Sequence, residues 1–109
     1  MSDAAAPLSR DLSRDRLVAE LRALRSQFES EGVTSMALFG SRARRDNRPD
    51  SDIDLVIEVD ESRKFSLLDL TGVGLIVQDR LGFPASILMR RSLSPEFQGE
   101  LRRDGIEIF

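Results

Sequence analysis

Two acidic residues, Asp52 and Asp54, have the types and the spacing that metal-assisted chemistry requires. They stand two positions apart in the apolar segment DIDLVIEV, which reads as a β-strand from Asp52 to Val59. On a strand, this spacing directs both side chains to one face, with Cα atoms roughly 6.6 Å apart. Two like charges on one face repel each other and lose hydration, whereas a divalent cation would neutralise both. The pair therefore predicts a site for Mg²⁺ and for the triphosphate that Mg²⁺ would bind.

A glycine–serine pair, Gly40-Ser41, precedes these acids by ten intervening residues. A glycine lets the backbone approach a ligand closely, and the serine adds a hydroxyl donor. If residues 41–44 form a helical turn, its free N–H groups would face a phosphate, and Arg42 could add a charge-assisted contact. Taken alone, each feature has an ordinary alternative, in which Gly40 ends a strand, Ser41 caps a turn and the acids are solvated.

The composition restricts the chemistry that the chain can perform. Its 109 residues contain no Cys and no His, which excludes thiolate nucleophiles, imidazole acid–base catalysis and most transition-metal sites. Carboxylates, hydroxyls and arginines remain, and carboxylates suit a hard cation such as Mg²⁺. The net charge of −3 argues against direct nucleic-acid binding, which normally requires a basic surface. No apolar segment approaches the roughly 20 residues of a membrane span, and the first residues do not resemble a signal peptide, so we expect a cytoplasmic location.

The periodicity of apolar residues predicts the elements that must position the site. We expect a flexible N-terminus over residues 1–10 and one domain over residues 11–109. Alternating helices and strands predict a small α/β domain. Helices are expected over residues 12–31, 65–81 and 94–103, and strands over 33–39, 52–59, 84–89 and 106–109.

The segment LFGSRARRDNRPDSDIDLVI resembles the signature of the DNA polymerase β-like nucleotidyltransferase superfamily, and more narrowly that of the minimal nucleotidyltransferase (MNT) family. The shared pattern is Gly-Ser, ten residues and Asp-x-Asp, and the resemblance extends over about residues 17–109. It implies an α+β fold, a mixed β-sheet with helices packed against it. It also implies transfer of a nucleoside monophosphate from an NTP, most simply ATP, with release of pyrophosphate. By motif position, Gly40 and Ser41 would hold the β- and γ-phosphates. Asp52 and Asp54 would ligate Mg²⁺.

The same resemblance suggests a partner. Many MNT proteins are antitoxins paired with a HEPN-domain toxin, and some adenylylate that toxin, so a protein acceptor is expected here. An alternative keeps the fold without efficient catalysis, as a binding module that neutralises its partner by complex formation. The helix expected over residues 65–81 carries more apolar residues than one buried face needs. Its surplus could form a docking surface for a partner or a second copy, or could be covered within the domain itself.

One position departs from the family pattern. The superfamily usually carries a third carboxylate on the strand after the Asp-x-Asp strand, where it completes the metal site and helps to deprotonate the acceptor hydroxyl. Here that position is Ser86, whose hydroxyl supplies no charge and cannot act as a base at neutral pH. Glu58 lies on the expected acidic face but about 13 Å along the strand from Asp54. Four further acids could substitute only if the fold brought them close: Asp46, Asp50, Asp79 and Asp104.

Overall fold

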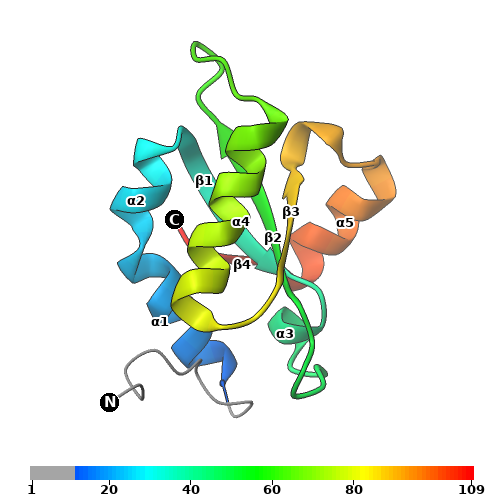
Figure 1. Ribbon diagram of the computed structural model, residues 1–109. Coiled ribbons are helices and arrows are strands. Elements are labelled where there is room, and N and C mark those ends of the chain that lie inside the picture. Colours follow the sequence, from blue (N-terminus) through cyan, green and yellow to red (C-terminus); the bar gives the residue numbers. More distant parts are fainter. Residues whose placement is uncertain (1–11) are drawn as a thin grey trace, which may run out of the picture.

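The computed structural model describes residues 12–109, so the prediction for residues 1–10 lies outside the described residues. Four strands form one mixed sheet in the order β3-β2-β1-β4. Their bounds are Val33–Phe39 for β1, Ile53–Val59 for β2, Ala85–Met89 for β3 and Ile106–Glu107 for β4. Strand β1 is antiparallel to both β2 and β4, whereas β2 and β3 are parallel. The predicted mixed sheet with packed helices is confirmed (Figure 1).

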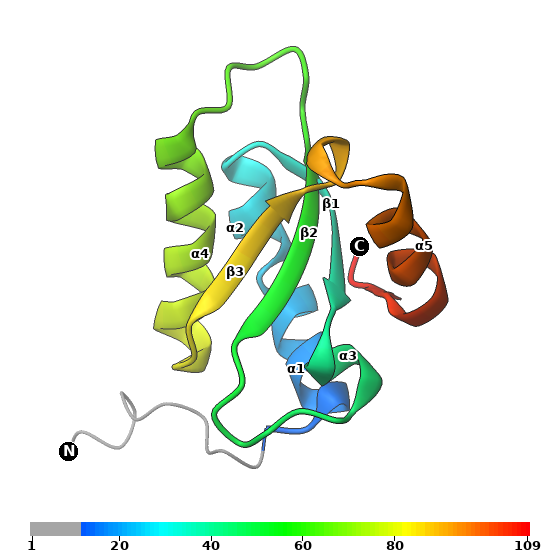
Figure 2. The same cartoon turned by 90° about the vertical axis from the view of Figure 1, so that its right-hand side faces the viewer.

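Helices cover both faces of the sheet, so β2 is a buried strand. The predicted site lies at the beginning of this strand. Helices α1 (Arg14–Ala23), α2 (Arg25–Ser30) and α4 (Leu67–Leu81) cover one face, and α5 (Pro95–Asp104) covers part of the other (Figure 2). On β2, the residues of the predicted apolar alternation point into the larger core, and Ile53, Leu55 and Ile57 are fully buried. Val56, on the opposite face, is buried against Leu101 of α5. Because β2 is packed on both faces, the backbone that carries Asp54 is held in a fixed position.

The helix expected over residues 12–31 is divided into two, because the backbone leaves the helix at Leu24. There the N–H of Leu24 donates to the carbonyl of Leu21 at 3.1 Å, and the backbone torsion angles are φ −93° and ψ 5°. The apolar stripe was predicted correctly, since Leu17, Leu21, Leu24 and Phe28 are all buried. Neither Gly nor Pro marks the break, and the buried apolar stripe continues across it.

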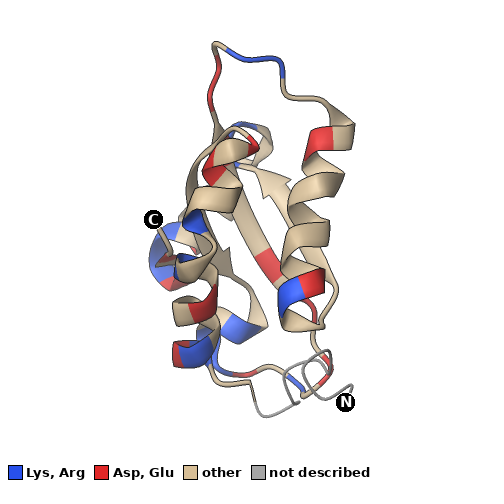
Figure 3. Cartoon of the chain, turned by 60° about the vertical axis from the view of Figure 1, so that its left-hand side comes forward, with Lys and Arg blue, Asp and Glu red and all other residues tan. Residues whose placement is uncertain are grey.

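Helix α4 carries the chain from β2 to the parallel strand β3. It begins with a capping box, in which the Ser66 hydroxyl accepts from the N–H of Asp69 and the Asp69 carboxylate accepts from the N–H of Ser66. It ends at Gly82, whose φ of +79° is left-handed and favours glycine. No charged residue occurs on α4 between Asp69 and Asp79 (Figure 3). None of the helices within residues 12–109 combines the length and apolarity needed to cross a membrane.

Candidate active site

The glycine–serine corner and the second acid of the pair are in direct contact. Gly40 follows β1 with φ +77° and ψ −158°, a conformation open essentially to glycine alone. Phe39 is paired in register with Asp54, which brings the corner beside the start of β2. A Cβ atom built on Gly40 would lie 2.5 Å from Oδ2 of Asp54. The absent side chain is therefore what allows the corner and the carboxylate to share one site.

The corner opens into α3, a single helical turn over Ser41–Arg44. The N–H groups of Ala43 and Arg44 both donate to the carbonyl of Gly40 at 3.1 Å. The turn contains no acceptor for the earlier N–H groups of Ser41 and Arg42, as at the start of any helix. Unsatisfied N–H groups beside a glycine suit an anionic ligand, as the sequence predicts for a phosphate.

The two acids differ in exposure. Asp52 was expected within the strand, but β2 begins at Ile53, so Asp52 lies one residue before it and is exposed. Asp54 is half-buried. Loss of hydration raises the pKa of Asp54, and the negative charge of Asp52 raises it further, while Arg44 and Arg42 oppose the change. The two carboxylates therefore act on each other, and a cation between them would relieve the unfavourable charge. Carboxylate oxygens are the ligands that Mg²⁺ prefers, so this pair fits the ion.

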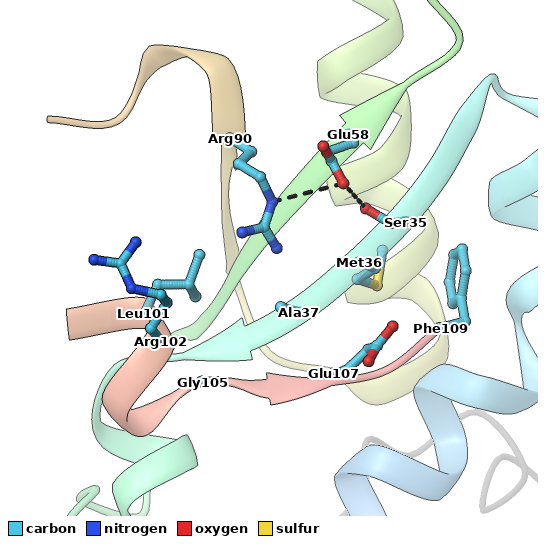
Figure 4. Close-up of a pocket in the computed structure, with 10 residues that line it drawn as sticks. All are labelled: Ser35, Met36, Ala37, Glu58, Arg90, Leu101, Arg102, Gly105, Glu107 and Phe109. Carbon is cyan, nitrogen blue, oxygen red and sulfur yellow. Dashed lines mark hydrogen bonds and ion pairs between the residues drawn. The ribbon is translucent and has the colours of Figure 1, made fainter. Parts of the chain in front are cut away.

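Ser86 stands where the third carboxylate of the family is expected. It is exposed and is paired in register with Asp54 on the parallel neighbour, so both side chains leave the same face of the sheet. Within residues 12–109, no group of three or more acidic side chains could hold a metal ion together. Glu58 is held elsewhere on this face, where it accepts from the Ser35 hydroxyl at 2.6 Å and forms an ion pair with Arg90 at 3.6 Å (Figure 4).

Restoring the missing acid gives a first prediction. In Ser86→Asp, the new carboxylate would stand beside Asp54 and add charge to the metal site. We expect the rate of nucleotidyl transfer to rise on the order of a hundredfold, because one metal-site carboxylate lowers the activation barrier by several kcal/mol. Turnover of labelled ATP measures the change. Ser86→Asn, similar in size but uncharged, is the matched control and should leave the rate low. Equal rates for Ser86→Asp and the natural chain would mean that another acid already fills this role.

The sequence predicts that Arg42 contacts a phosphate, whereas in the structure its side chain is buried within the protein. Only 2% of its surface is exposed. Its Nε atom donates to the carbonyl of Ser51 at 3.0 Å, its Nη2 atom donates to that of Pro49 at 3.2 Å, and the guanidinium lies 4.6 Å from the ring centroid of Phe83. Burial lowers the pKa of Arg42, and the acids Asp50, Asp52 and Asp54 oppose this effect. The side chain therefore positions the loop that leads to Asp52.

A cleft of about 150 Å³ lies beside Gly40. Phe97 and Glu100, which line it, were not predicted as site residues from the sequence. Phe39 and Phe97 meet edge to face there, with ring centroids 5.1 Å apart. The pKa of Arg44 is raised chiefly by its hydrogen bond to Asp46, and also by Asp104 and Glu100. The spacing of Glu100 and Asp104, four residues on one helix face, is a signal that could have indicated this acidic wall. The cleft gives room for part of a ligand next to the Gly40-Ser41 corner.

The fold and the site together define a nucleotide-transfer domain. The profile of the family described as "Nucleotidyltransferase domain" matches residues 20–107. The chain belongs to this family, and its sheet and helices have the fold of the minimal nucleotidyltransferases.

Individual relatives support this assignment. A Methanocaldococcus jannaschii protein with the provisional name of a protein adenylyltransferase is 30% identical over 77 residues, which are 71% of this chain and 81% of that protein. A solved structure provisionally described as a minimal nucleotidyltransferase is similar with a TM-score of 0.73 and 31% identity, covering 88% of this chain and 96% of that chain. A complex of a tri-AMPylated Shewanella oneidensis HEPN toxin with its MNT antitoxin matches with a TM-score of 0.62 and 14% identity, covering 88% and 71%. At that identity, the similarity is one of fold.

Proposed function

We propose that this protein transfers AMP from ATP to a hydroxyl group of a protein partner. The observation that carries the proposal is the close approach of Gly40 to Asp54, where a Cβ atom on residue 40 would lie only 2.5 Å from Oδ2 of Asp54. A conformation restricted to glycine, placed against a carboxylate and next to unsatisfied N–H groups, suits a metal–triphosphate. The name of the Methanocaldococcus jannaschii relative supports a protein as the acceptor.

In this proposal, Asp52 and Asp54 hold Mg²⁺. The N–H groups of Ser41 and Arg42 and the Ser41 hydroxyl bind the β- and γ-phosphates. The metal, when bound, neutralises charge on the triphosphate and on the pyrophosphate that leaves. The acceptor oxygen forms a bond to the α-phosphorus as the bond to the bridging oxygen of pyrophosphate breaks, and the proton of the acceptor hydroxyl passes to solvent water. Ser86 cannot take the acceptor proton as a carboxylate would, so we expect slow turnover.

Ser86 itself favours a second candidate function, in which the chain binds its partner without efficient transfer. Ser86, which is neutral, is in register with Asp54, and within residues 12–109 no group of three acids comes together to hold a metal ion. A partner would then be neutralised by complex formation alone. The Shewanella oneidensis complex supports a HEPN-type toxin as the kind of partner to test in both cases.

One experiment tests the proposal and separates it from the alternative. The chain is incubated with α-labelled ATP, Mg²⁺ and a HEPN-domain protein as the candidate acceptor. Transfer predicts label on the HEPN-domain protein, which chelation of Mg²⁺ should abolish. The double variant Asp52→Asn/Asp54→Asn should lose the labelling, because both metal ligands lose their charge. If the double variant still neutralises the partner and the natural chain adds no label, the binding module is the correct function.

A further inference from the structure

The hydroxyl of Ser86 stands beside the acid that is proposed to hold the metal. Ser86 is in register with Asp54 on the neighbouring strand, so the two backbones are about 4.8 Å apart and both side chains leave the same face of the sheet. Ser86 is exposed, whereas Asp54 is half-buried. A serine hydroxyl cannot act as a base at neutral pH, but it can act as a nucleophile toward a bound substrate.

Within residues 12–109, the sheet face that carries Ser86 is open over β3. On this face α5 packs against the neighbouring strands, where Val56 of β2 is buried against Leu101. Leu88, two residues after Ser86 and on the same face, is 38% exposed. A nucleotide can therefore lie over β3 and reach the Ser86 hydroxyl without displacing a helix.

The proposed function, on which this inference rests, gives the triphosphate a direction across the sheet. The β- and γ-phosphates bind at Ser41, which follows β1, and Asp54 on β2 holds the metal beside them. Strand β2 lies between β1 and β3. The α-phosphate, which is the part of the triphosphate farthest from the Ser41 turn, therefore lies toward β3 and toward the Ser86 hydroxyl.

The other hydroxyls near the site are less suitable as acceptors of AMP. The hydroxyl of Ser41 faces the terminal phosphates, and attack on the γ-phosphorus would transfer phosphate and release ADP. The hydroxyl of Ser51, just before Asp52, accepts a hydrogen bond from the N–H of Arg48 at 2.8 Å. Ser86 is thus the hydroxyl of the site that is best placed for the α-phosphorus.

We propose that Ser86 is itself an acceptor of AMP, so that the chain modifies itself once and then stops. The Ser86 Oγ atom forms a bond to the α-phosphorus, the bond from that phosphorus to the bridging oxygen of pyrophosphate breaks, and the hydroxyl proton passes to solvent water. Pyrophosphate leaves, and AMP stays on Ser86 as a phosphodiester. The attached AMP occupies the space beside Asp54, so a second ATP is excluded and transfer to a partner ends.

Incubation of the chain alone with ATP and Mg²⁺ tests this proposal. Intact-protein mass spectrometry should show the addition of one AMP group, and peptide fragmentation should place it on Ser86. Ser86→Ala should stay unmodified, whereas Ser86→Thr keeps a hydroxyl on a side chain that suits a strand and should be modified. Ser92→Ala, which removes an exposed hydroxyl from the turn after β3, is the control and should be modified like the natural chain. The first-order rate should not change with protein concentration, because the hydroxyl and the ATP belong to one complex.

Calorimetric binding of α,β-methylene-ATP, which cannot release pyrophosphate, supplies a second measurement in the presence of Mg²⁺. The natural chain and Ser86→Ala should bind this analogue equally. The chain that already carries AMP on Ser86, freed of ATP, should bind it at least about tenfold more weakly. Equal binding by the modified chain would overturn the proposed inhibition.

The outcomes separate this proposal from the proposed transfer to a partner. A natural chain that binds the analogue but stays unmodified with ATP would overturn self-modification, as would AMP on any residue other than Ser86. Transfer to a partner would still stand in both cases if a HEPN-domain protein became labelled. A chain that does not bind the analogue would overturn both proposals.

Discussion

Replacing Asp54 by Asn should reduce AMP transfer at least about a thousandfold, since the site would lose half of the negative charge proposed to hold the metal. Asp54 is the acid in contact with the Gly40 corner, so no other carboxylate replaces it without moving the corner as well. Because Ser86 is proposed to keep the natural rate low, the loss is best measured in the Ser86→Asp background. Asp50→Asn removes the same charge from an exposed side chain of the neighbouring loop and should retain most of the activity. Comparable losses in both variants would contradict a specific role for Asp54.

Asp54→Asn should increase the stability of the fold when divalent metal is chelated, although it reduces activity. The pKa of Asp54 is raised in the folded protein, chiefly by loss of hydration, so the charged carboxylate destabilises the fold near neutral pH. Asp54→Asn should therefore melt at a higher temperature than the natural chain. The sign follows from proton binding: the folded state binds this proton more tightly than the unfolded chain, so lower pH favours the natural fold. The difference should shrink as pH falls from the raised pKa to the ordinary carboxyl pKa. A lower melting temperature for Asp54→Asn at neutral pH would contradict this account.

Gly40→Ala should both destabilise the fold and abolish transfer. The φ of +77° with ψ −158° strains any residue other than glycine, at about 1–3 kcal/mol. The new methyl group would also lie 2.5 Å from Oδ2 of Asp54 and would force that carboxylate away from the corner. Denaturant unfolding measures the first effect, and labelled ATP measures the second.

Gly72→Ala provides the matched control for this substitution. Gly72 lies in α4, and a Cβ atom there would make an ordinary contact, 3.6 Å from Oε1 of Glu31. Because alanine favours the helix, this variant should gain up to about 1 kcal/mol and keep its activity. If both alanine variants unfolded at the same denaturant concentration as the natural chain, the conformation of Gly40 would not be essential to the corner.

The main features of the fold could be predicted because they depend on local patterns. Alternating apolar residues identified the buried face of β2, and the Gly-Ser and Asp-x-Asp spacing indicated the elements that meet at the site. The contact between Gly40 and Asp54 depends on the antiparallel pairing of β1 with β2, which the predicted mixed sheet did not specify. The position of Ser86 beside Asp54 likewise depends on the parallel register of β3.

Other features arise from contacts between distant residues and left no clear mark in the sequence. Arg42 was predicted to contact a phosphate because it follows Gly40-Ser41. In the structure its guanidinium packs on Phe83, which is about 40 residues away in the sequence and follows α4. The end of α3 at Arg45 has a left-handed φ of 67°, a conformation that is uncommon for residues other than glycine. The sequence around Arg45 does not indicate this turn.

The buried guanidinium of Arg42 couples three segments of the site to one another. One side chain ties the loop before Asp52 to Phe83, which precedes β3 and Ser86, while its own backbone belongs to the turn after Gly40. Three segments from separate parts of the chain thus contact the same side chain, so a displacement of one segment would be transmitted to the other two. A ligand that restricts the turn after Gly40 should therefore also restrict the loop before Asp52 and the residues that lead into β3.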